Sequence, residues 1–255
     1  MKPKVLIIRA AGTNCDVETA YAFELAGAIA QRVYIDEVKD KNILDYQIIA
    51  LPGGFTYGDD IAAGKILSNE IKYKLRDKIM KFIEKGNLII GICNGFQILV
   101  KCGILPGFKR YFEKQSVSLV NNDSERFEDR WVSLKVYGER TVFTKGVNPI
   151  ITLPVAHAEG KFVAKDDEAL KKIKDHIVFQ YVDKNGRAAG YPFNPNGSVL
   201  SIAGIADKSG RILGLMPHPE RYVSCFQHPN HTREKLNDAG DGLNIFKNAV
   251  DYFKS

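Results

Sequence analysis

The sequence predicts an α/β fold in which helices cover a doubly wound, mostly parallel sheet. Through the first part of the chain, short apolar runs alternate with longer segments of helical periodicity, which is the order that such a sheet requires. The runs at residues 4–9, 47–51 and 88–92 are apolar except at their ends, as expected of strands that are buried on both faces. Because folds of this kind bind ligands beyond the carboxyl ends of their strands, we expect the functional residues in the loops that follow these runs.

The elements of the first half follow from spacing and turn residues. Apolar, β-branched runs predict strands at residues 4–9, 30–35, 47–51 and 88–92. Apolar residues at helical spacing predict helices over residues 17–26, 68–83 and 96–102. Asp16 stands where the N-cap of the first helix belongs, and Gly27 ends that helix.

The second half is richer in strand patterns than in helical ones. Strands are predicted at residues 116–120, 131–136, 177–182, 199–205 and 212–216, and a closing amphipathic helix at residues 241–253. Asn185 and Gly186 form a typical hairpin turn. Since no Pro-, Ser- or Gly-rich linker interrupts the chain, we expect these segments to be antiparallel additions to the α/β core. Residues 1–255 are therefore expected to form a single domain.

Composition and charge exclude several classes of protein. Hydrophobic residues make up 45% of the 255 residues, which excludes disordered, collagen-like and coiled-coil chains. The net charge is only +6, and the basic residues are not clustered with aromatic ones as a nucleic-acid surface requires. The apolar run at residues 5–8 ends at Arg9, and no run approaches the roughly 20 apolar residues of a membrane span. We therefore expect a cytoplasmic protein that binds neither nucleic acid nor membrane.

Cys93 has the clearest chemical context of any residue in the chain. It follows the strand at residues 88–92 and precedes a helix, and Gly91 and Gly95 lie two residues away on either side. This is the cysteine form of the nucleophile elbow, whose strained turn requires small neighbours. The N-terminus of the following helix favours the thiolate form of the sulfur. An inert buried cysteine is the usual state of this residue type, but the glycines and the strand-then-helix context favour a nucleophile.

A thiolate nucleophile needs a partner that moves protons, and His218 is the best candidate among five histidines. It follows the predicted strand at residues 212–216, and a proline on each side stiffens its segment. Glu220 lies two residues further on, where its carboxylate can orient the imidazole. Taken alone, His218 could equally be an incidental residue of a surface loop. Together with Cys93 it predicts a Cys-His-Glu triad.

Two backbone positions are candidates for stabilising a negatively charged tetrahedral intermediate. The Pro52-Gly53-Gly54 turn follows the third predicted strand, and glycine there lets the backbone approach a substrate closely. The N–H group of Asn94 is the second candidate. On its own the turn could be purely structural. A phosphate-binding Walker A loop is excluded, because Gly64-Lys65 is followed by Ile66 in place of Ser or Thr.

Cys225, His228 and His231 could be drawn as a metal site, but three ligands at this spacing do not match a standard zinc pattern. We therefore expect no metal. The cysteines outside the elbow are Cys15, Cys102 and Cys225. They are expected to be dispensable for chemistry and to form no disulfide framework.

Residues 91–97 (GICNGFQ), together with His218-Pro219-Glu220 far downstream, resemble the class I (triad) glutamine amidotransferases. More narrowly, five segments in order along almost the whole chain resemble the glutaminase component of phosphoribosylformylglycinamidine synthase, the fourth step of de novo purine synthesis. These segments are residues 12–16 (GTNCD), 51–60 (LPGGFTYGDD), 156–162 (AHAEGKF), 194–198 (NPNGS) and 217–221 (PHPER). The one departure is Ala11, where the family pattern has proline. The resemblance implies the flavodoxin-like fold of the class I glutamine amidotransferases.

The resemblance also implies the chemical role of each triad residue. Cys93 would attack the side-chain amide of L-glutamine and form a γ-glutamyl thioester with release of ammonia. His218 would act first as acid and then as base, and Glu220 would orient it.

Substrate contacts and partners follow from the same resemblance. The N–H groups of Gly54 and Asn94 would form the oxyanion hole, and Gln97, His157 and Glu159 would contact the bound glutamine. No cofactor is expected on this chain, because it has no ATP-binding loop of its own. A separate synthetase subunit would use ATP and Mg²⁺ to convert formylglycinamide ribonucleotide to formylglycinamidine ribonucleotide with the ammonia. A small third subunit would help to assemble the complex.

Two other interpretations stay open at this point. The same fold carries other triad enzymes, such as a γ-glutamyl hydrolase or the glutaminase of pyridoxal phosphate synthesis, and fold alone does not separate them. The chain could also be a non-catalytic module that regulates a synthetase, although such modules usually lose the nucleophile. Release of ammonia from glutamine, with turnover that rises when the synthetase is added, distinguishes these possibilities.

Overall fold

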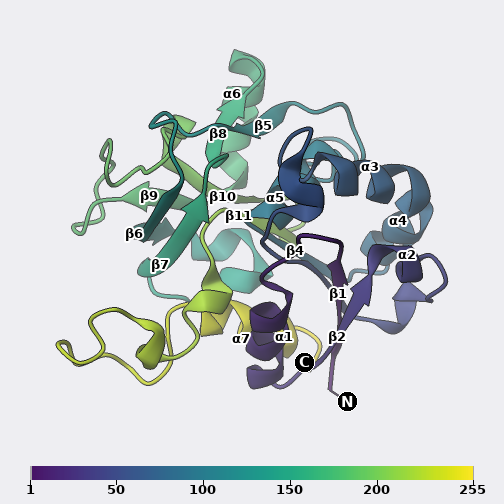
Figure 1. Cartoon of the computed structure of the whole chain (residues 1–255), viewed down its shortest axis with the longest axis horizontal. Helices are drawn as coiled ribbons and strands as arrows, with labels where there is room; N and C mark the ends of the chain where they lie inside the picture. The colour runs from purple at the N-terminus through teal and green to yellow at the C-terminus, as the bar shows by residue number, and fades with distance from the viewer. Residues whose placement is uncertain (1, 255) are drawn as a thin grey trace.

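A nine-stranded sheet runs through the computed structural model, which describes residues 2–254 (Figure 1). Its strands are, in spatial order, β2 (Ile29–Tyr34), β1 (Lys4–Arg9), β3 (Ile48–Leu51), β4 (Leu88–Ile92), β11 (Ile212–Leu215), β10 (Ile202–Ala206), β9 (Ile177–Val182), β6 (Glu128–Val136) and β7 (Ile150–His157). The strands from β2 to β11 pair in parallel, and those from β11 to β7 pair antiparallel. The predicted fold class, a mostly parallel sheet with antiparallel additions, is confirmed.

Helices cover both faces of the parallel part of the sheet (Figure 1). The α-helices of the described chain are α1 (Asp16–Leu25), α2 (Ile35–Val38), α3 (Lys65–Lys74), α4 (Arg76–Glu84), α5 (Asn94–Lys101), α6 (Asp167–Ile173) and α7 (Leu243–Asp251). On one face, α1 packs against α7, where the rings of Phe23 and Phe246 meet edge to face 4.9 Å apart. On the other face, α5 packs against β3, β4 and β11. A separate two-stranded sheet pairs β5 (Val117–Val120) with β8 (Lys161–Ala164).

The central strands form the core because they are apolar on both faces. Every residue of β3, β4 and β11 is buried, which is the burial expected for parallel strands between two helical layers. β4 lies between β3 and β11, with Ile92 opposite Leu215 at their carboxyl ends. The loops after these strands therefore leave the sheet side by side.

The helix predicted over residues 68–83 is two helices, α3 and α4. The break lies at Leu75, whose backbone has φ −118° and ψ 2°. Leu75 is itself a buried apolar residue at helical spacing, so periodicity continues through the break. The N-cap of α1 also differs from expectation: it is Cys15, and Asp16 is the first helical residue. The Asp16 carboxylate instead pairs with Arg9 at 3.1 Å and Arg32 at 3.2 Å.

The strands β7 and β8 and the short helices α2 and α6 were not predicted. β7 contains Pro154, a residue that cannot donate a hydrogen bond to a neighbouring strand. It is tolerated because β7 lies at the edge of the sheet. Its side chains alternate between buried and partly exposed, which is the pattern of a strand that covers the core with one face. Within residues 2–254, no helix has the length and apolar character needed to cross a bilayer.

Candidate active site

Cys93 lies in a strained turn between β4 and α5. Its backbone has φ 51° and ψ −105°, a positive φ that non-glycine residues rarely adopt. A Cβ atom added at Gly91 would lie 2.6 Å from the carbonyl oxygen of Gly95. One added at Gly95 would lie 1.9 Å from the carbonyl oxygen of Leu51. The glycines that flank Cys93 are therefore required by close backbone contacts, as the elbow geometry predicts.

The Cys93 side chain is buried at the start of α5, against β7 and β11. Cys93 precedes α5 as its N-cap residue, so it lies at the positive end of the helix dipole. Its N–H group donates to the carbonyl oxygen of Leu215 at 2.7 Å, which ties the turn to β11. The sulfur lies 3.7 Å from the carbonyl oxygen of Ala156 on β7. Only 5% of the residue is exposed.

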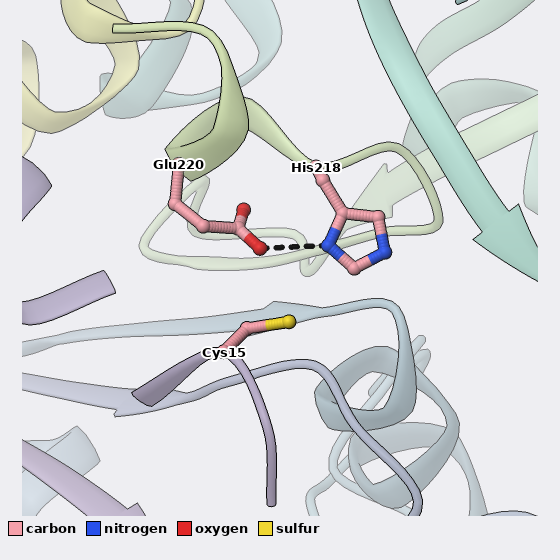
Figure 2. Close-up of side chains that lie close together, drawn as sticks. All are labelled: Cys15, His218 and Glu220. Atoms are coloured by element: carbon pink, nitrogen blue, oxygen red, sulfur yellow. Dashed lines mark hydrogen bonds and ion pairs between the residues drawn. The ribbon is translucent and has the colours of Figure 1, made fainter. Parts of the chain in front are cut away.

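His218 and Glu220 follow β11, the strand next to the one that ends at Cys93. The N–H group of His218 donates to the carbonyl oxygen of Pro154 at 2.8 Å, which fixes the segment against β7. Glu220 lies in the 3₁₀ turn Pro219–Arg221. Its Oε1 atom lies 2.7 Å from Nδ1 of His218, as Figure 2 shows. Both side chains are almost completely buried.

The charge state of His218 depends on burial and on its polar neighbours. Burial by itself would lower the pKa of the imidazole, but the Glu220 carboxylate and the sulfurs of Cys93 and Cys15 raise the pKa well above its ordinary value. The imidazolium form is therefore stabilised beside Cys93. Within the described residues, the buried Nε2 atom of His218 has no hydrogen-bond partner of normal geometry. This leaves the nitrogen that faces away from Glu220 available for proton transfer.

Gly54 and Asn94 are the candidate oxyanion donors, and Gly54 lines the same cavity as Cys93. The Gly53-Gly54 turn is held by the loop after β1, since Asn14 N–H donates to Gly53 at 3.3 Å and Phe55 N–H donates to Gly12 at 2.8 Å. Gly54 has φ +142°, a conformation that favours glycine. Within residues 2–254, the N–H groups of Gly54 and Asn94 donate to no protein acceptor. These two N–H groups can therefore donate hydrogen bonds to a negatively charged oxygen, as an oxyanion hole requires.

A cavity of about 230 Å³ opens beside Cys93. Its lining includes Gly54, Phe55, Asp59, Ala63, Gln97 and residues 156–159. Both polar atoms of the Gln97 side chain are hydrogen-bonded. Its Nε2 atom donates to the carbonyl oxygen of Glu159 at 2.6 Å, and its Oε1 atom accepts from the Asn94 side-chain amide at 3.0 Å. The Glu159 carboxylate pairs with Lys101 at 3.8 Å. The three residues expected to contact substrate, Gln97, His157 and Glu159, thus all line this cavity.

His157 ends β7 and is buried, with 3% exposed. Its Nδ1 atom lies 3.2 Å from Oδ1 of Asn122, and Asn122 also donates to the His157 carbonyl oxygen at 2.8 Å. Burial, helped by the nearby His218 charge, lowers the pKa of His157 to about 3. The ring is therefore neutral at physiological pH and acts as an apolar and hydrogen-bonding wall of the cavity.

The family model for the CobB/CobQ-like glutamine amidotransferase domain matches residues 2–253 of the chain. The chain belongs to this family.

Known amidotransferase relatives match over almost their entire length. The chain is 52% identical to the phosphoribosylformylglycinamidine synthase subunit PurQ of Dehalococcoides mccartyi, over 98% of each chain. It is 45% identical to the subunit of the same name from Archaeoglobus fulgidus, over 98% of this chain and 97% of that one. The resemblance seen in the sequence motifs is confirmed.

Solved structures agree with this assignment. A chain of the PurLQS structure from Thermotoga maritima matches with a TM-score of 0.74 and 34% identity, over 99% of this chain and 100% of that one. The glutaminase domain of CTPS from Trypanosoma brucei matches with a TM-score of 0.55 over 98% of this chain and 94% of that one. At 13% identity, the second likeness shows the fold alone.

Two residues beside the candidate site were not singled out from the sequence. Asp59 and Lys101 reach the cavity region from different elements, and burial raises the pKa of Asp59 and lowers that of Lys101. Asp59 accepts from the Asn94 amide at 3.2 Å and from Gly64 N–H at 3.1 Å. Its positive φ of 54° is a conformation in which aspartate is enriched. The Gly58-Asp59 pair was therefore the local sign of an unusual turn.

Potential metal ligands gather at a different place from the one considered in the sequence. Within the described part of the chain, the one group of three with ligand atoms mutually within 4.8 Å is Cys15, His218 and Glu220. His228 instead packs its ring against Trp131 at 4.6 Å, and His231 contacts the His228 carbonyl oxygen.

Proposed function

We propose that this chain is the glutaminase subunit of phosphoribosylformylglycinamidine synthase, and that Cys93, His218 and Glu220 are its catalytic triad. The full-length relatives that carry this subunit name support the first part. The position of the strained Cys93 turn beside the buried His218–Glu220 pair supports the second. This juxtaposition of β4 and β11 is the observation that carries the proposal.

The triad hydrolyses L-glutamine in two steps. The Cys93 thiolate attacks the carbon of the side-chain amide and forms a C–S bond, and the C–N bond then breaks as the His218 imidazolium protonates the leaving nitrogen. The products of this step are ammonia and a γ-glutamyl thioester. Neutral His218 next removes a proton from water, which attacks the thioester and releases glutamate and the Cys93 thiolate. Glu220 keeps the imidazole in one orientation and stabilises its charged form.

The surrounding residues stabilise the charge that develops and hold the substrate. A tetrahedral intermediate carries a negative oxygen, and the N–H groups of Gly54 and Asn94 are the donors for it. Gln97, His157 and Glu159 contact the glutamine in the cavity beside Cys93. No metal or cofactor takes part on this chain.

The ammonia is used by other subunits of the complex. Protonated ammonia is no longer a nucleophile, so it has to pass directly and dry to its acceptor. A separate synthetase subunit uses ATP and Mg²⁺ to convert formylglycinamide ribonucleotide to formylglycinamidine ribonucleotide, and a small third subunit helps to assemble the complex. The match to a full chain of the PurLQS structure supports an assembly of this kind. We place the complex in the cytoplasm.

Substitution of the nucleophile in the reconstituted complex tests this proposal. Cys93→Ser should abolish synthesis with glutamine as donor and leave synthesis from added ammonium salts at the wild-type rate. The buried Cys102 provides a matched control, and Cys102→Ser should retain both activities. Loss of both activities in Cys93→Ser, or of neither, contradicts the role of Cys93. Ammonia release that is indifferent to the synthetase would favour a free-standing glutaminase or γ-glutamyl hydrolase. A chain with no release at all would be a regulatory module.

A further inference from the structure

Cys15 lies next to the catalytic pair although it belongs to the opposite end of the chain. It is the N-cap residue of α1 and only 1% exposed. Its N–H group donates to the carbonyl oxygen of Gly53 at 3.1 Å, and its own carbonyl oxygen accepts from the Thr19 hydroxyl at 2.6 Å. The backbone of Cys15 is therefore anchored on both sides.

The Cys15 sulfur faces the hydrogen bond between His218 and Glu220. One ligand atom from each of the three residues lies within 4.8 Å of the others. Figure 2 shows the sulfur pointing toward the bond between Nδ1 and Oε1. Gly53 permits this approach, because a Cβ atom there would lie 2.8 Å from Cε1 of His218 and 3.2 Å from the Cys15 sulfur. Gly53, the neighbour of the proposed oxyanion donor Gly54, thus packs against both His218 and Cys15.

Arg221 places a fixed positive charge beside the Cys15 sulfur. The Nη2 atom of Arg221 donates to the Cys15 sulfur at 3.1 Å. The same guanidinium interacts electrostatically with Glu220. Oε2 of Glu220 is buried and has no hydrogen-bond partner among the described residues, so the carboxylate depends on this charge and on His218. A cation at the three-residue cluster would meet the positive guanidinium, which disfavours a metal there.

We propose that Cys15 is a positioning residue whose thiol, held by Arg221, keeps the His218 imidazole and the Glu220 carboxylate in their hydrogen-bonded arrangement. The inference rests on the proposed triad and departs from the expectation that Cys15 is dispensable. The groups that face His218 are Glu220, Cys93, Cys15 and His157, with Arg221 behind Cys15. Removing the Cys15 sulfur takes away one of the groups that raise the pKa of His218. It also leaves the Arg221 donor without its acceptor.

The test measures glutamine-dependent and ammonium-dependent synthesis by the reconstituted complex that contains Cys15→Ala. We expect kcat with glutamine to fall at least about tenfold, because small misplacements of a catalytic group are costly. KM should stay unchanged, since Cys15 does not line the cavity. The His218-dependent limb of the pH profile should move to lower pH, and ammonium-dependent synthesis should persist. Cys15→Ser offers an oxygen to Arg221 and should restore part of the rate and of the pH profile.

Cys102→Ala is the matched control, because Cys102 is equally buried and its thiol donates to the carbonyl oxygen of Leu99 in the preceding helix α5. It should leave the pH profile unchanged. A merely structural role for Cys15 would lower the melting temperature of Cys15→Ala while kcat and the pH profile stayed at wild-type values, and that result overturns the inference. If the proposed triad is wrong, glutamine-dependent synthesis survives in Cys93→Ser, so that failure is distinguishable from failure of the Cys15 inference.

Discussion

The α-carbon of Gly95 packs directly against the carbonyl oxygen of Leu51, at a distance that leaves no room for a Cβ atom. This contact joins the first turn of α5 to the end of β3. It also brings the nucleophile turn beside the Pro52-Gly53-Gly54 turn, which begins at the next residue. The position of the Cys93 turn relative to the turn that carries Gly54 therefore depends on this backbone contact.

Gly95→Ala should displace the first turn of α5 and with it Cys93. A methyl group 1.9 Å from a carbonyl oxygen forces a backbone shift, and overpacking of this kind costs roughly 1–3 kcal/mol of unfolding free energy. Glutaminase activity should fall by about a hundredfold or more, since an error near 1 Å at a catalytic group costs that much. Urea unfolding and ammonia release measure the two effects. Gly190→Ala is the matched control and should behave as the wild type, because a Cβ atom added at Gly190 meets no atom within 4 Å. A fully active Gly95→Ala would contradict the packing argument.

Glu220→Gln should slow glutamine hydrolysis by about a hundredfold or more, because the neutral amide no longer stabilises the imidazolium. Burial lowers the pKa of His218 and Glu220 opposes this effect. Without the carboxylate, the His218-dependent limb of the pH profile should therefore move to lower pH. Rates of ammonia release between pH 5 and 9 measure both changes. Glu84→Gln is the matched control, because Glu84 is exposed. If the limb of the pH profile does not shift in Glu220→Gln, Glu220 is not part of the triad.

His157 should make the protein less stable in mild acid. The pKa of His157 is about 3 in the folded state and about 6.5 in an unfolded chain. Between these values the unfolded state binds a proton that the native state does not, so stability falls as pH drops from 6.5. One such group contributes a slope of up to about 1.4 kcal/mol per pH unit. Unfolding titrations at pH 7, 6 and 5 should show a shallower slope for His157→Gln than for the wild type. The exposed His231→Gln should keep the wild-type slope, and equal slopes in all three proteins would disprove the assignment.

The strands of the parallel core could be predicted because their limits are marked by local residues. β1 and β4 begin and end where the apolar runs do, and so does β9 in the antiparallel half. β7 was missed because Pro154 is a strand breaker by local rules, and only its place at the sheet edge makes it acceptable. The break at Leu75 was missed because the residue continues the apolar periodicity and no Gly or Pro marks it.

The residues of the candidate site likewise fall into those that the local sequence marks and those that it does not. Cys93 and His218 could be singled out because each follows an apolar strand and has special neighbours in the sequence. Cys15 and Lys101 could not, because their positions beside the site depend on packing between distant segments. Cys15 reaches His218 only because the loop after β1 and the turn after β3 are hydrogen-bonded to each other. No local pattern encodes that contact.

The parallel pairing of β4 with β11 has a consequence for how such a chain can diversify. Cys93 and His218, the proposed nucleophile and its proposed partner, follow neighbouring strands, while the long intervening stretch folds into the antiparallel half of the sheet and the β5–β8 ribbon. Loops in that half that lie away from residues 154–159 can lengthen, shorten or be exchanged without altering the pairing of β4 with β11. Partner contacts carried by those loops can therefore change independently of the proposed triad.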